Sequence, residues 1–235
     1  MPRYGTVVFD CDSTLSTIEG IEELAGEHAA EVAALTDAAM RGVVPLEEVY
    51  GRRLDRIRPD RSAVEALGKR YIETLVPDAR ATIAALREEG VDVRVVSGGL
   101  LPAILRLTRE LGIDDEAVAA VDVYFDETGR YAGFDAGSPL AYAGGKRIIL
   151  ERWAPGLARP VMMVGDGATD LEARPVVDAF VAFAGVVERP TVVAAADVVI
   201  RARTLAPVLA LALDGEPPRG AEALAVFEYG ARILG

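Results

Sequence analysis

Two carboxylates two residues apart follow the first apolar run of the chain, Val7 to Phe9. An apolar run of this kind predicts a buried strand of a parallel sheet, and ligands of such sheets gather at the carboxyl ends of the strands. Asp10 and Asp12 are expected at that end. Because neighbouring carboxylates repel each other, the pair favours a bound cation, a shared proton or an incoming substrate. An Asx-type turn that closes the strand is the alternative that these residues leave open.

A second segment, PVMMVGDGATDLEA at 160–173, repeats this pattern. Its apolar strand is expected to end at Asp166, and Asp170 follows four residues later, after a glycine-flanked turn. If the two strands share one parallel sheet, Asp10 and Asp166 can together supply oxygen ligands to a hard cation such as magnesium. That ion typically takes one or two protein carboxylates and keeps water and substrate phosphate as its other ligands.

Two further segments offer groups that suit an anion. Ser97-Gly98-Gly99 stands between the strand-like VDVRVV and the helix-like LPAILRLTRELG, so a hydroxyl and backbone N–H groups are expected at a helix start. A plain serine cap is the alternative. Lys146 follows two glycines at the start of another predicted helix, where its charge opposes the macrodipole. Only Lys69 and Lys146 are lysines among 25 basic residues, so we interpret Lys146 as a clamp for an anion.

The elements that must position these residues fall into two parts. Residues 16 to about 75 carry helical patterns, with apolar residues such as Ile21, Leu24 and Ala25 at helix spacing. From Pro77 onward helical and strand patterns alternate, which predicts an α/β core with a parallel sheet. A hairpin is expected at 121–134, two strands at 179–183 and 197–200, and a final helix at 221–235. We expect a core of residues 1–16 and 76–235, with a helical insertion at 17–75.

The composition of the chain argues against several classes of partner and indicates a location. The formal charge of the 235 residues is -12, which argues against nucleic acid and an anionic membrane surface as partners. No apolar run approaches the roughly 18 residues of a membrane span, and the first residues lack the features of a signal peptide, so a cytoplasmic protein is expected. Cys11, the single cysteine, excludes an internal disulfide and is interpreted as a packing residue. His28 has no ligand-type residue at i+4 and is given no role.

Four segments in a fixed order resemble the haloacid dehalogenase superfamily, and within it the phosphoserine phosphatases. They are FDCDST with EGIEELA directly after it, VVSGG, GRYAGFD leading to GGK, and GDGATDLEA followed by DAFVAF. The helical insertion separates the first from the second. These segments extend from residue 7 to about residue 200, so the resemblance leaves out only the end of the chain.

The resemblance implies a Rossmann-like parallel-sheet core with an inserted helical cap that closes over the site. It implies that Asp10 is the nucleophile that attacks phosphorus and forms an aspartyl-phosphate. Asp12 would protonate the leaving serine oxygen and then activate water. Magnesium would be held by Asp10, the backbone carbonyl of Asp12 and Asp166, with Asp170 supporting the metal site.

The same resemblance assigns the phosphoryl oxygens to Ser97, the Gly98 amide and Lys146. Thr169 is the one departure within the fourth segment, because many bacterial and archaeal relatives carry asparagine there. Threonine at this place is similar to the animal phosphoserine phosphatases, so Thr169 is kept among the expected substrate contacts.

For the cap, the resemblance points to Glu19 for the serine ammonium and to Arg53 for the carboxylate, with Met40 as a wall of the pocket. Arg53 is placed by counting from Met40-Arg41-Gly42, and Arg52 and Arg56 remain alternatives. For any single arginine of so arginine-rich a chain, a solvated surface position is the competing interpretation.

Three functions remain open from the sequence. The first is a magnesium-dependent phosphatase that hydrolyses phosphoserine. The second is a related phosphatase or phosphotransferase that acts on another small phosphate monoester, and the third is a phosphate-binding module without turnover. The intact pair of Asp10 and Asp12 argues against the third, because a module without turnover has no use for an acid–base residue. Oligomeric state, with a homodimer as one alternative, stays open.

Overall fold

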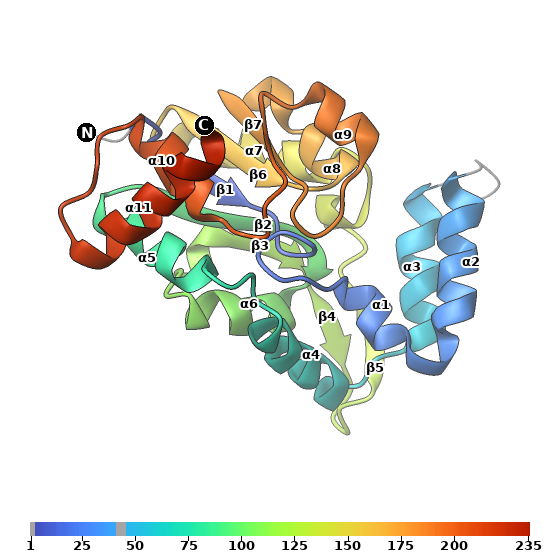
Figure 1. Cartoon of the computed structure of the whole chain (residues 1–235). Coiled ribbons are helices and arrows are strands. Elements are labelled where there is room, and N and C mark those ends of the chain that lie inside the picture. Colours follow the sequence, from blue (N-terminus) through green and yellow to red (C-terminus); the bar gives the residue numbers. More distant parts are fainter. Residues whose placement is uncertain (1–2, 41–45) are drawn as a thin grey trace.

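A six-stranded parallel sheet forms the centre of the computed structural model, which describes residues 3–40 and 46–235, with side chains outside 36–47 (Figure 1). Strands β1, β6 and β7 are buried at every position, or nearly so, as expected when helices cover both faces of a parallel sheet. This confirms the predicted α/β fold class. In spatial order the strands are β3 (Val118–Val121), β2 (Asp92–Leu100), β1 (Thr6–Phe9), β6 (Val161–Gly165), β7 (Ala179–Phe183) and β8 (Val198–Ile200).

Two apolar layers lie on opposite faces of the sheet. Alternate residues of β1 enter different layers: Val7 and Phe9 join one, and Val8 joins the other, as the two-residue period of a strand requires. The first layer is covered by α5 (Ala79–Glu88), α6 (Leu101–Glu110), α10 (Ala206–Leu213) and α11 (Ala221–Leu234), and the second by α7 (Gly145–Trp153) and α9 (Pro190–Ala195).

Among the described residues, four α-helices lie between β1 and α5, where the sequence predicts a helical insertion. They are α1 (Gly20–Ala25), α2 (Ala29–Met40), α3 (Leu46–Ile57) and α4 (Arg61–Glu73). Figure 1 shows α2 and α3 side by side at one end of the molecule. The two ends of this segment meet, because Ser16 and Leu75 form an antiparallel bridge. The division into core and cap stays a prediction, since α4 also packs against α6.

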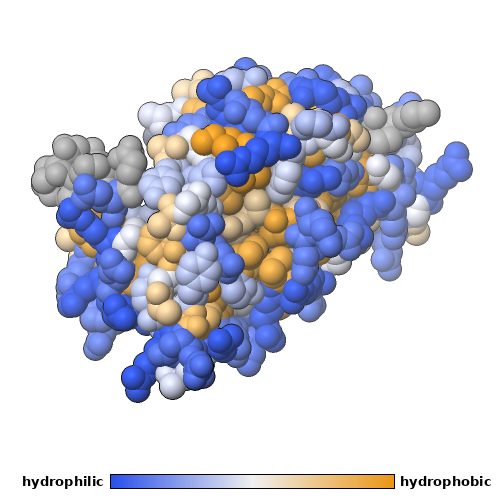
Figure 2. Space-filling model, turned by 180° about the vertical axis from the view of Figure 1, so that it is seen from behind, coloured by the Kyte–Doolittle hydropathy of each residue, from blue (hydrophilic) through white to orange (hydrophobic). Residues whose placement is uncertain are grey.

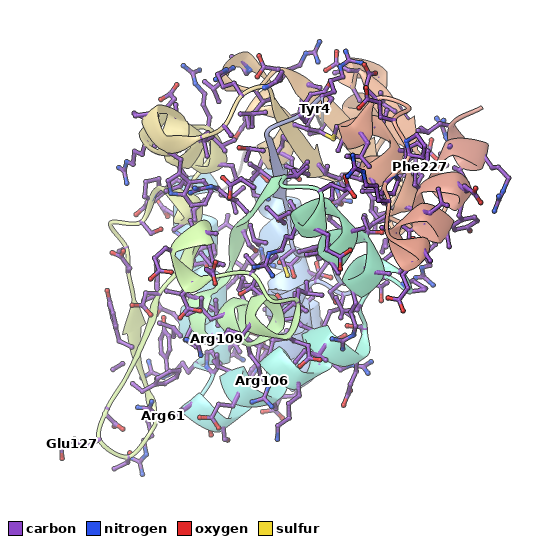
Figure 3. All side chains as sticks on the ribbon, turned by 90° about the vertical axis from the view of Figure 1, so that its left-hand side faces the viewer. Tyr4, Arg61, Arg106, Arg109, Glu127 and Phe227 are labelled. Carbon is purple, nitrogen blue, oxygen red and sulfur yellow. The ribbon has the colours of Figure 1, made fainter. Side chains whose placement is uncertain are left out.

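The hairpin of β4 (Val123–Phe125) and β5 (Tyr131–Phe134) reaches from the sheet toward these helices. Its turn accepts a hydrogen bond from the backbone of Arg61, whose N donates to Gly129 O at 2.8 Å. Figure 3 shows Arg61 beside the turn that carries Glu127, and the guanidinium of Arg61 lies 4.9 Å from the ring centre of Phe125. The start of α4 is therefore tied to the hairpin.

Two local predictions need correction. The helical pattern of the sequence continues without a break from 18 to 40 within the predicted helical insertion, but Gly26 has a φ of 47° and ends α1, so that α2 begins at Ala29. Strand β2 continues through Ser97-Gly98-Gly99 to Leu100, with an irregular register after Val96. Helix α6 accordingly has no side-chain cap, so the serine-cap alternative for Ser97 is wrong.

The described surface is largely hydrophilic, as Figure 2 shows for one face, although apolar side chains gather near its middle. Among the described residues, the large hydrophobic side chains with more than a third of their area exposed are Tyr124, Tyr142, Ile148, Tyr229 and Leu234. No helix in the described ranges is long and apolar enough to span a membrane.

Candidate active site

Three buried carboxylates meet at the carboxyl edge of the sheet. Asp10 follows β1 and Asp166 follows β6, which are adjacent parallel strands with Phe9 opposite Val164. Asp170 lies in the short helix α8 (Ala168–Leu171). Each of the three offers an oxygen within 4.8 Å of the others. The structure thus brings together the carboxylates that the two repeated segments of the sequence were expected to supply.

Lys146 supplies a positive charge to this cluster from the start of α7. Its Nζ lies 2.6 Å from Asp10 Oδ1 and 2.6 Å from Asp170 Oδ1. Burial disfavours the charged amine, but the two carboxylates outweigh burial and raise the pKa of Lys146 above its usual value. The helix start can approach this closely because residue 145 is glycine: a Cβ there would lie 2.0 Å from Pro139 O.

The cluster has the oxygen atoms and the free lone pairs that a divalent cation needs. Asp10 Oδ1 and Asp166 Oδ2 are buried near cationic side chains, but neither accepts a well-directed hydrogen bond from a described residue. Asp170 differs, since its Oδ2 accepts from Gly167 N at 2.9 Å and its Oδ1 from Lys146. Asp10 and Asp166 therefore suit direct ligation, whereas Asp170 suits a supporting role.

The electrostatics of the cluster favour a cation as well. Burial, followed by repulsion from Asp170, raises the pKa of Asp166 to about 7 against an ordinary value of 3.8. Burial and the neighbouring Asp170 likewise raise the pKa of Asp10, while Lys146 opposes them. A divalent cation would relieve this accumulated negative charge, and the all-oxygen donor set fits a hard ion.

Asp12 occupies a different environment from its neighbour Asp10. Its Oδ1 accepts hydrogen bonds from Gly20 N at 2.9 Å and from the hydroxyl of Tyr71 at 2.6 Å. Burial and the negative charge of Glu19 raise the pKa of Asp12 to about 6, although the two hydrogen bonds act in the opposite direction. A carboxyl with a pKa near neutrality can both give and take a proton, which is the behaviour of a general acid and base. Its backbone carbonyl as a metal ligand stays a prediction.

A cavity of about 380 Å³ opens above these groups. Expected site residues from distant parts of the sequence share its wall, namely Asp10, Asp12, Glu19, Arg53, Gly98, Lys146, Asp166, Thr169 and Asp170. Ser97 is fully buried and does not line it; its Oγ accepts a hydrogen bond from Gly99 N at 2.9 Å. The side chain of Met40 lies outside the described residues, so its expected place in the wall stays a prediction.

Of the three candidate arginines, Arg53 is the one whose side chain reaches the cavity. Its Nε is buried and donates to no described residue. Arg52 pairs with Glu48 and Arg56 with Glu31, in both cases on the exposed surface of the helices. Glu19 also lines the cavity, and it accepts a hydrogen bond of 2.6 Å from Ser13 Oγ. Beyond the carboxylate cluster and Lys146, the charged residues of the cavity wall are Asp12, Glu19, Arg53, Glu172 and Arg189.

Three residues of the site are absent from the predictions. Arg189, which precedes α9, lines the cavity with NH1 3.2 Å from Asp166 Oδ2 and NH2 3.6 Å from Glu19 Oε1. Tyr50 in α3 donates to Gly98 O at 2.9 Å, and Tyr71 in α4 donates to Asp12. Nothing distinguishes Arg189 from the other arginines of the sequence, and the two tyrosines read as apolar positions of amphipathic helices.

Comparison with known proteins places this arrangement in a family. The model of the haloacid dehalogenase-like hydrolases matches residues 4–174. The chain belongs to this family. It is 38% identical over 192 residues to a phosphoserine phosphatase of Bos taurus, covering 79% of this chain and 84% of that one. A chloroplastic phosphoserine phosphatase of Arabidopsis thaliana is 39% identical over 196 residues, covering 81% and 66% of the two chains.

Solved structures agree with the haloacid dehalogenase-like assignment. A phospho-aspartyl intermediate analogue of phosphoserine phosphatase superposes with a TM-score of 0.73 at 30% identity, covering 88% of this chain and 98% of that one. A substrate-bound phosphoserine phosphatase complex gives a TM-score of 0.73 at 29% identity, with 88% and 97% covered. Both likenesses cover 88% of this chain, so the fold of the family extends over most of its length.

Proposed function

We propose that this haloacid dehalogenase-like hydrolase is a magnesium-dependent phosphatase that converts O-phospho-L-serine to L-serine and phosphate, the last step of serine biosynthesis. The observation that carries the proposal is one cavity lined by two kinds of charged group. Asp10, Asp166 and Lys146 suit a metal-assisted phosphoryl transfer, and Glu19 and Arg53 suit the charged groups of an amino acid. The relatives named phosphoserine phosphatase support the same substrate.

In this proposal Asp10 attacks phosphorus and the bond to the serine oxygen breaks, which leaves an aspartyl-phosphate on Asp10. Asp10 and Asp166 would hold a magnesium ion, which when bound offsets the negative charge shared by the carboxylates and the phosphoryl oxygens. Lys146 lies beside Asp10 and can face a phosphoryl oxygen, because its charge is maintained by two carboxylates. The Gly98 amide and Ser97 are proposed as further contacts of the phosphoryl group, with Thr169 nearby in the cavity wall.

Asp12 gives its proton to the leaving serine oxygen in the first step. In the second step the resulting carboxylate takes a proton from water, which attacks the phosphorus of the aspartyl-phosphate and frees Asp10. The raised pKa of Asp12 suits both steps, because the group exchanges its proton near neutral pH. Asp10 and Asp12 thus do different work, and their different surroundings are the physical reason.

Selection of serine is assigned to the helical segment. The phosphate of phosphoserine is handled at the sheet edge, so its ammonium and carboxylate need partners of opposite charge elsewhere. Glu19 fits the ammonium, and the unpaired Arg53 fits the carboxylate as a planar fork. Met40 is proposed as an apolar wall. A cytoplasmic location is proposed as well, in keeping with the sequence features described above.

A substrate panel tests the proposal. The purified chain with magnesium is given phosphoserine, phosphothreonine, phosphoethanolamine and glycerol phosphate, and released phosphate is measured. We expect the highest kcat/KM for phosphoserine. A higher kcat/KM for another ester would instead identify a phosphatase for that small monoester, and phosphate binding without release from any ester would identify a binding module.

A further inference from the structure

Tyr71 makes a contact with Asp12 that the reaction described above does not use. The side chain of Tyr71 is fully buried in α4, and its hydroxyl donates to Asp12 Oδ1 at 2.6 Å. The backbone N–H of Gly20 donates to the same oxygen at 2.9 Å. No group among the described residues donates to Asp12 Oδ2. The two oxygens of this carboxyl are therefore inequivalent: one is held by the protein, and the other is available to a ligand in the cavity.

Close packing fixes where the hydroxyl of Tyr71 lies. A Cβ at Gly20 would lie 1.9 Å from Tyr71 Oη, and a Cβ at Gly99 would lie 3.3 Å from it. Glycine at position 20 is thus required for the approach of α1, Asp12 and Tyr71 to one another. The hydroxyl has no room to turn to another acceptor without moving these backbones, so its hydrogen bond to Asp12 is a constrained one.

Helix α4 is held in place independently of this contact. Gly68 faces α6 so closely that a Cβ would lie 2.7 Å from Arg106 Cδ, and Figure 3 shows Arg106 where α6 faces α4. At its other end Asp60 caps the helix, accepting from Ala63 N at 2.8 Å. The position of the tyrosine is therefore set by the packing of α4 against the core and not by Asp12 itself.

We propose that Tyr71 is a positioning residue for Asp12. By holding Oδ1 together with Gly20 N, it keeps the proton-bearing Oδ2 directed at the leaving oxygen. In that step the bond from phosphorus to the leaving oxygen breaks, phosphorus bonds to Asp10, and the proton moves from Asp12 Oδ2 to the leaving oxygen. The inference rests on the proposed function only in taking Asp12 as the acid.

The dependence of kcat/KM on the leaving group distinguishes a role of Tyr71 in positioning Asp12 from a merely structural role. An alkoxide such as that of serine needs a proton as it departs, whereas p-nitrophenolate departs readily without one. Tyr71→Phe removes the hydroxyl and keeps the ring that fills the core. We expect kcat/KM for phosphoserine to fall about tenfold, a part of the roughly 10²–10⁴-fold that general acid–base catalysis contributes, with KM changed less than about threefold. For p-nitrophenyl phosphate we expect kcat/KM to change less than about threefold.

Tyr131→Phe is the matched control. Tyr131 is also buried, but its hydroxyl has no hydrogen-bond partner among the described residues and it does not line the cavity. This variant should leave both substrates unaffected. In an Asp12→Asn background, Tyr71→Phe should have no further effect on phosphoserine, because the proton that it positions is gone.

An equal loss of kcat/KM for both substrates, or no loss for either, would overturn the positioning role. If Tyr71→Phe fails to fold, Gly20→Ala provides a second variant, because its Cβ displaces the tyrosine hydroxyl; it should show the same dependence on leaving group. A wild-type chain that leaves phosphoserine intact would contradict the proposed function alone. The comparison is then made with whichever alkyl phosphate the chain does hydrolyse.

Discussion

At the scale of single residues, the contacts of Lys146 with the carboxylates around it support the proposed role of Asp10 as the nucleophile. Lys146 Nζ contacts Asp10 and Asp170 at the same distance, so a single charge serves two carboxylates. Asp170 keeps its other oxygen on the backbone of Gly167, whereas Asp10 accepts no well-directed hydrogen bond from the described residues. Compared with Asp170, Asp10 is therefore held by fewer hydrogen bonds, and its oxygens are more available to a ligand.

Asp10→Asn should abolish phosphate release while leaving the fold in place. The amide is nearly isosteric but a poor nucleophile, and it removes one of several mutually repelling charges. Binding of magnesium, measured by calorimetry, should persist through Asp166. Thermal unfolding of the metal-free variant should occur no lower than that of the wild type. Substantial phosphate release by Asp10→Asn would contradict a covalent mechanism on this residue.

Arg53→Ala should remove the preference for substrates that carry a carboxylate. Phosphoethanolamine lacks that group, so in the wild type it leaves the half-buried guanidinium of Arg53 unpaired and should be a poor substrate. For phosphoserine we expect the variant to lose about 2–5 kcal/mol of transition-state binding, the scale for breaking a buried charged pair. For phosphoethanolamine kcat/KM should change little.

Arg52→Ala and Arg56→Ala are the controls for this prediction, because each arginine pairs with a surface glutamate. Both should keep the discrimination between the two substrates. If Arg53→Ala keeps it and a control loses it, the carboxylate is bound by that other arginine; if none of the three matters, the substrate is not an amino-acid phosphate.

The sequence predicts residues that carry an unusual signal and misses those that do not. Lys146 stands out because the chain otherwise uses arginine, and Asp10 and Asp166 stand out because each closes an apolar run. Arg189 has no such signal, and its place in the cavity depends on how the loop before α9 folds over the edge of the sheet. Tertiary contacts of this kind cannot be deduced from local spacing.

At the scale of elements, α11 covers α10 and α5 on the side of the sheet that carries the larger apolar layer. It buries Ala223, Phe227 and Gly230. The contact at Gly230 is the closest, because a Cβ there would lie 2.2 Å from Ala206 O at the start of α10. The helix follows the segments that resemble the family, and none of its residues lines the cavity.

Gly230→Val should therefore lower stability without changing the chemistry. Overpacking of this kind costs about 1–3 kcal/mol, which corresponds to a fall in Tm of roughly 2–12 °C for a chain of this size. Below that transition kcat/KM should match the wild type. Ala231→Val introduces the same side chain at the exposed neighbouring position, and it should change Tm far less even though valine has a lower helix propensity than alanine. Equal shifts in the two variants would contradict close packing at Gly230.

Helices and strands can be predicted from this sequence where the apolar residues recur at a uniform spacing. The prediction is uncertain where glycine interrupts that spacing. The apolar runs of β6 and β7 and the amphipathic pattern of α5 follow directly from the sequence. In β2 the two glycines suggest a turn, but the strand continues through them to Leu100, which pairs with Val121 of β3 after an irregular register. At Gly26 the reverse occurs: a residue tolerated in a helix instead takes a positive φ and divides it.

At the scale of the whole molecule, activity should depend on a divalent cation. EDTA should abolish phosphate release, and added magnesium should restore it, because Asp10 and Asp166 repel the substrate's phosphate until their charge is offset. Calcium should substitute poorly, since its larger and looser coordination disturbs the in-line geometry of the transfer. Full activity in EDTA would contradict a metal site at this cluster.

Stability should depend on pH in the metal-free protein. The pKa of Asp12 is raised to about 6 and that of Asp166 to about 7, against 3.8 in the unfolded chain. The folded state then binds more protons, so its stability is greatest below about pH 4 for these groups and is lost as pH rises through 6 and 7. In EDTA, Tm should fall between pH 5 and pH 8.

Magnesium should raise Tm more at pH 8 than at pH 5, because it binds the ionised carboxylates. Asp166→Asn should flatten the pH dependence. The surface carboxyls with lowered pKa, such as Asp60 and Asp115, do not interfere, since their contribution is complete above pH 5. A Tm in EDTA that rises from pH 5 to pH 8 would contradict the raised pKa values of the cluster.

Arg189 adds a constraint on how the site fills. One guanidinium contacts Asp166, an expected ligand of the cation, and Glu19, the expected partner of an ammonium group. If a cation binds Asp166 and an ammonium binds Glu19, each competes with one contact of the same arginine. Binding of the two would then be thermodynamically linked, and by reciprocity each would change the other's affinity by the same factor. Arg189 is thus a shared counter-ion of the two carboxylates, and through it the metal site and the amino-acid site would be coupled.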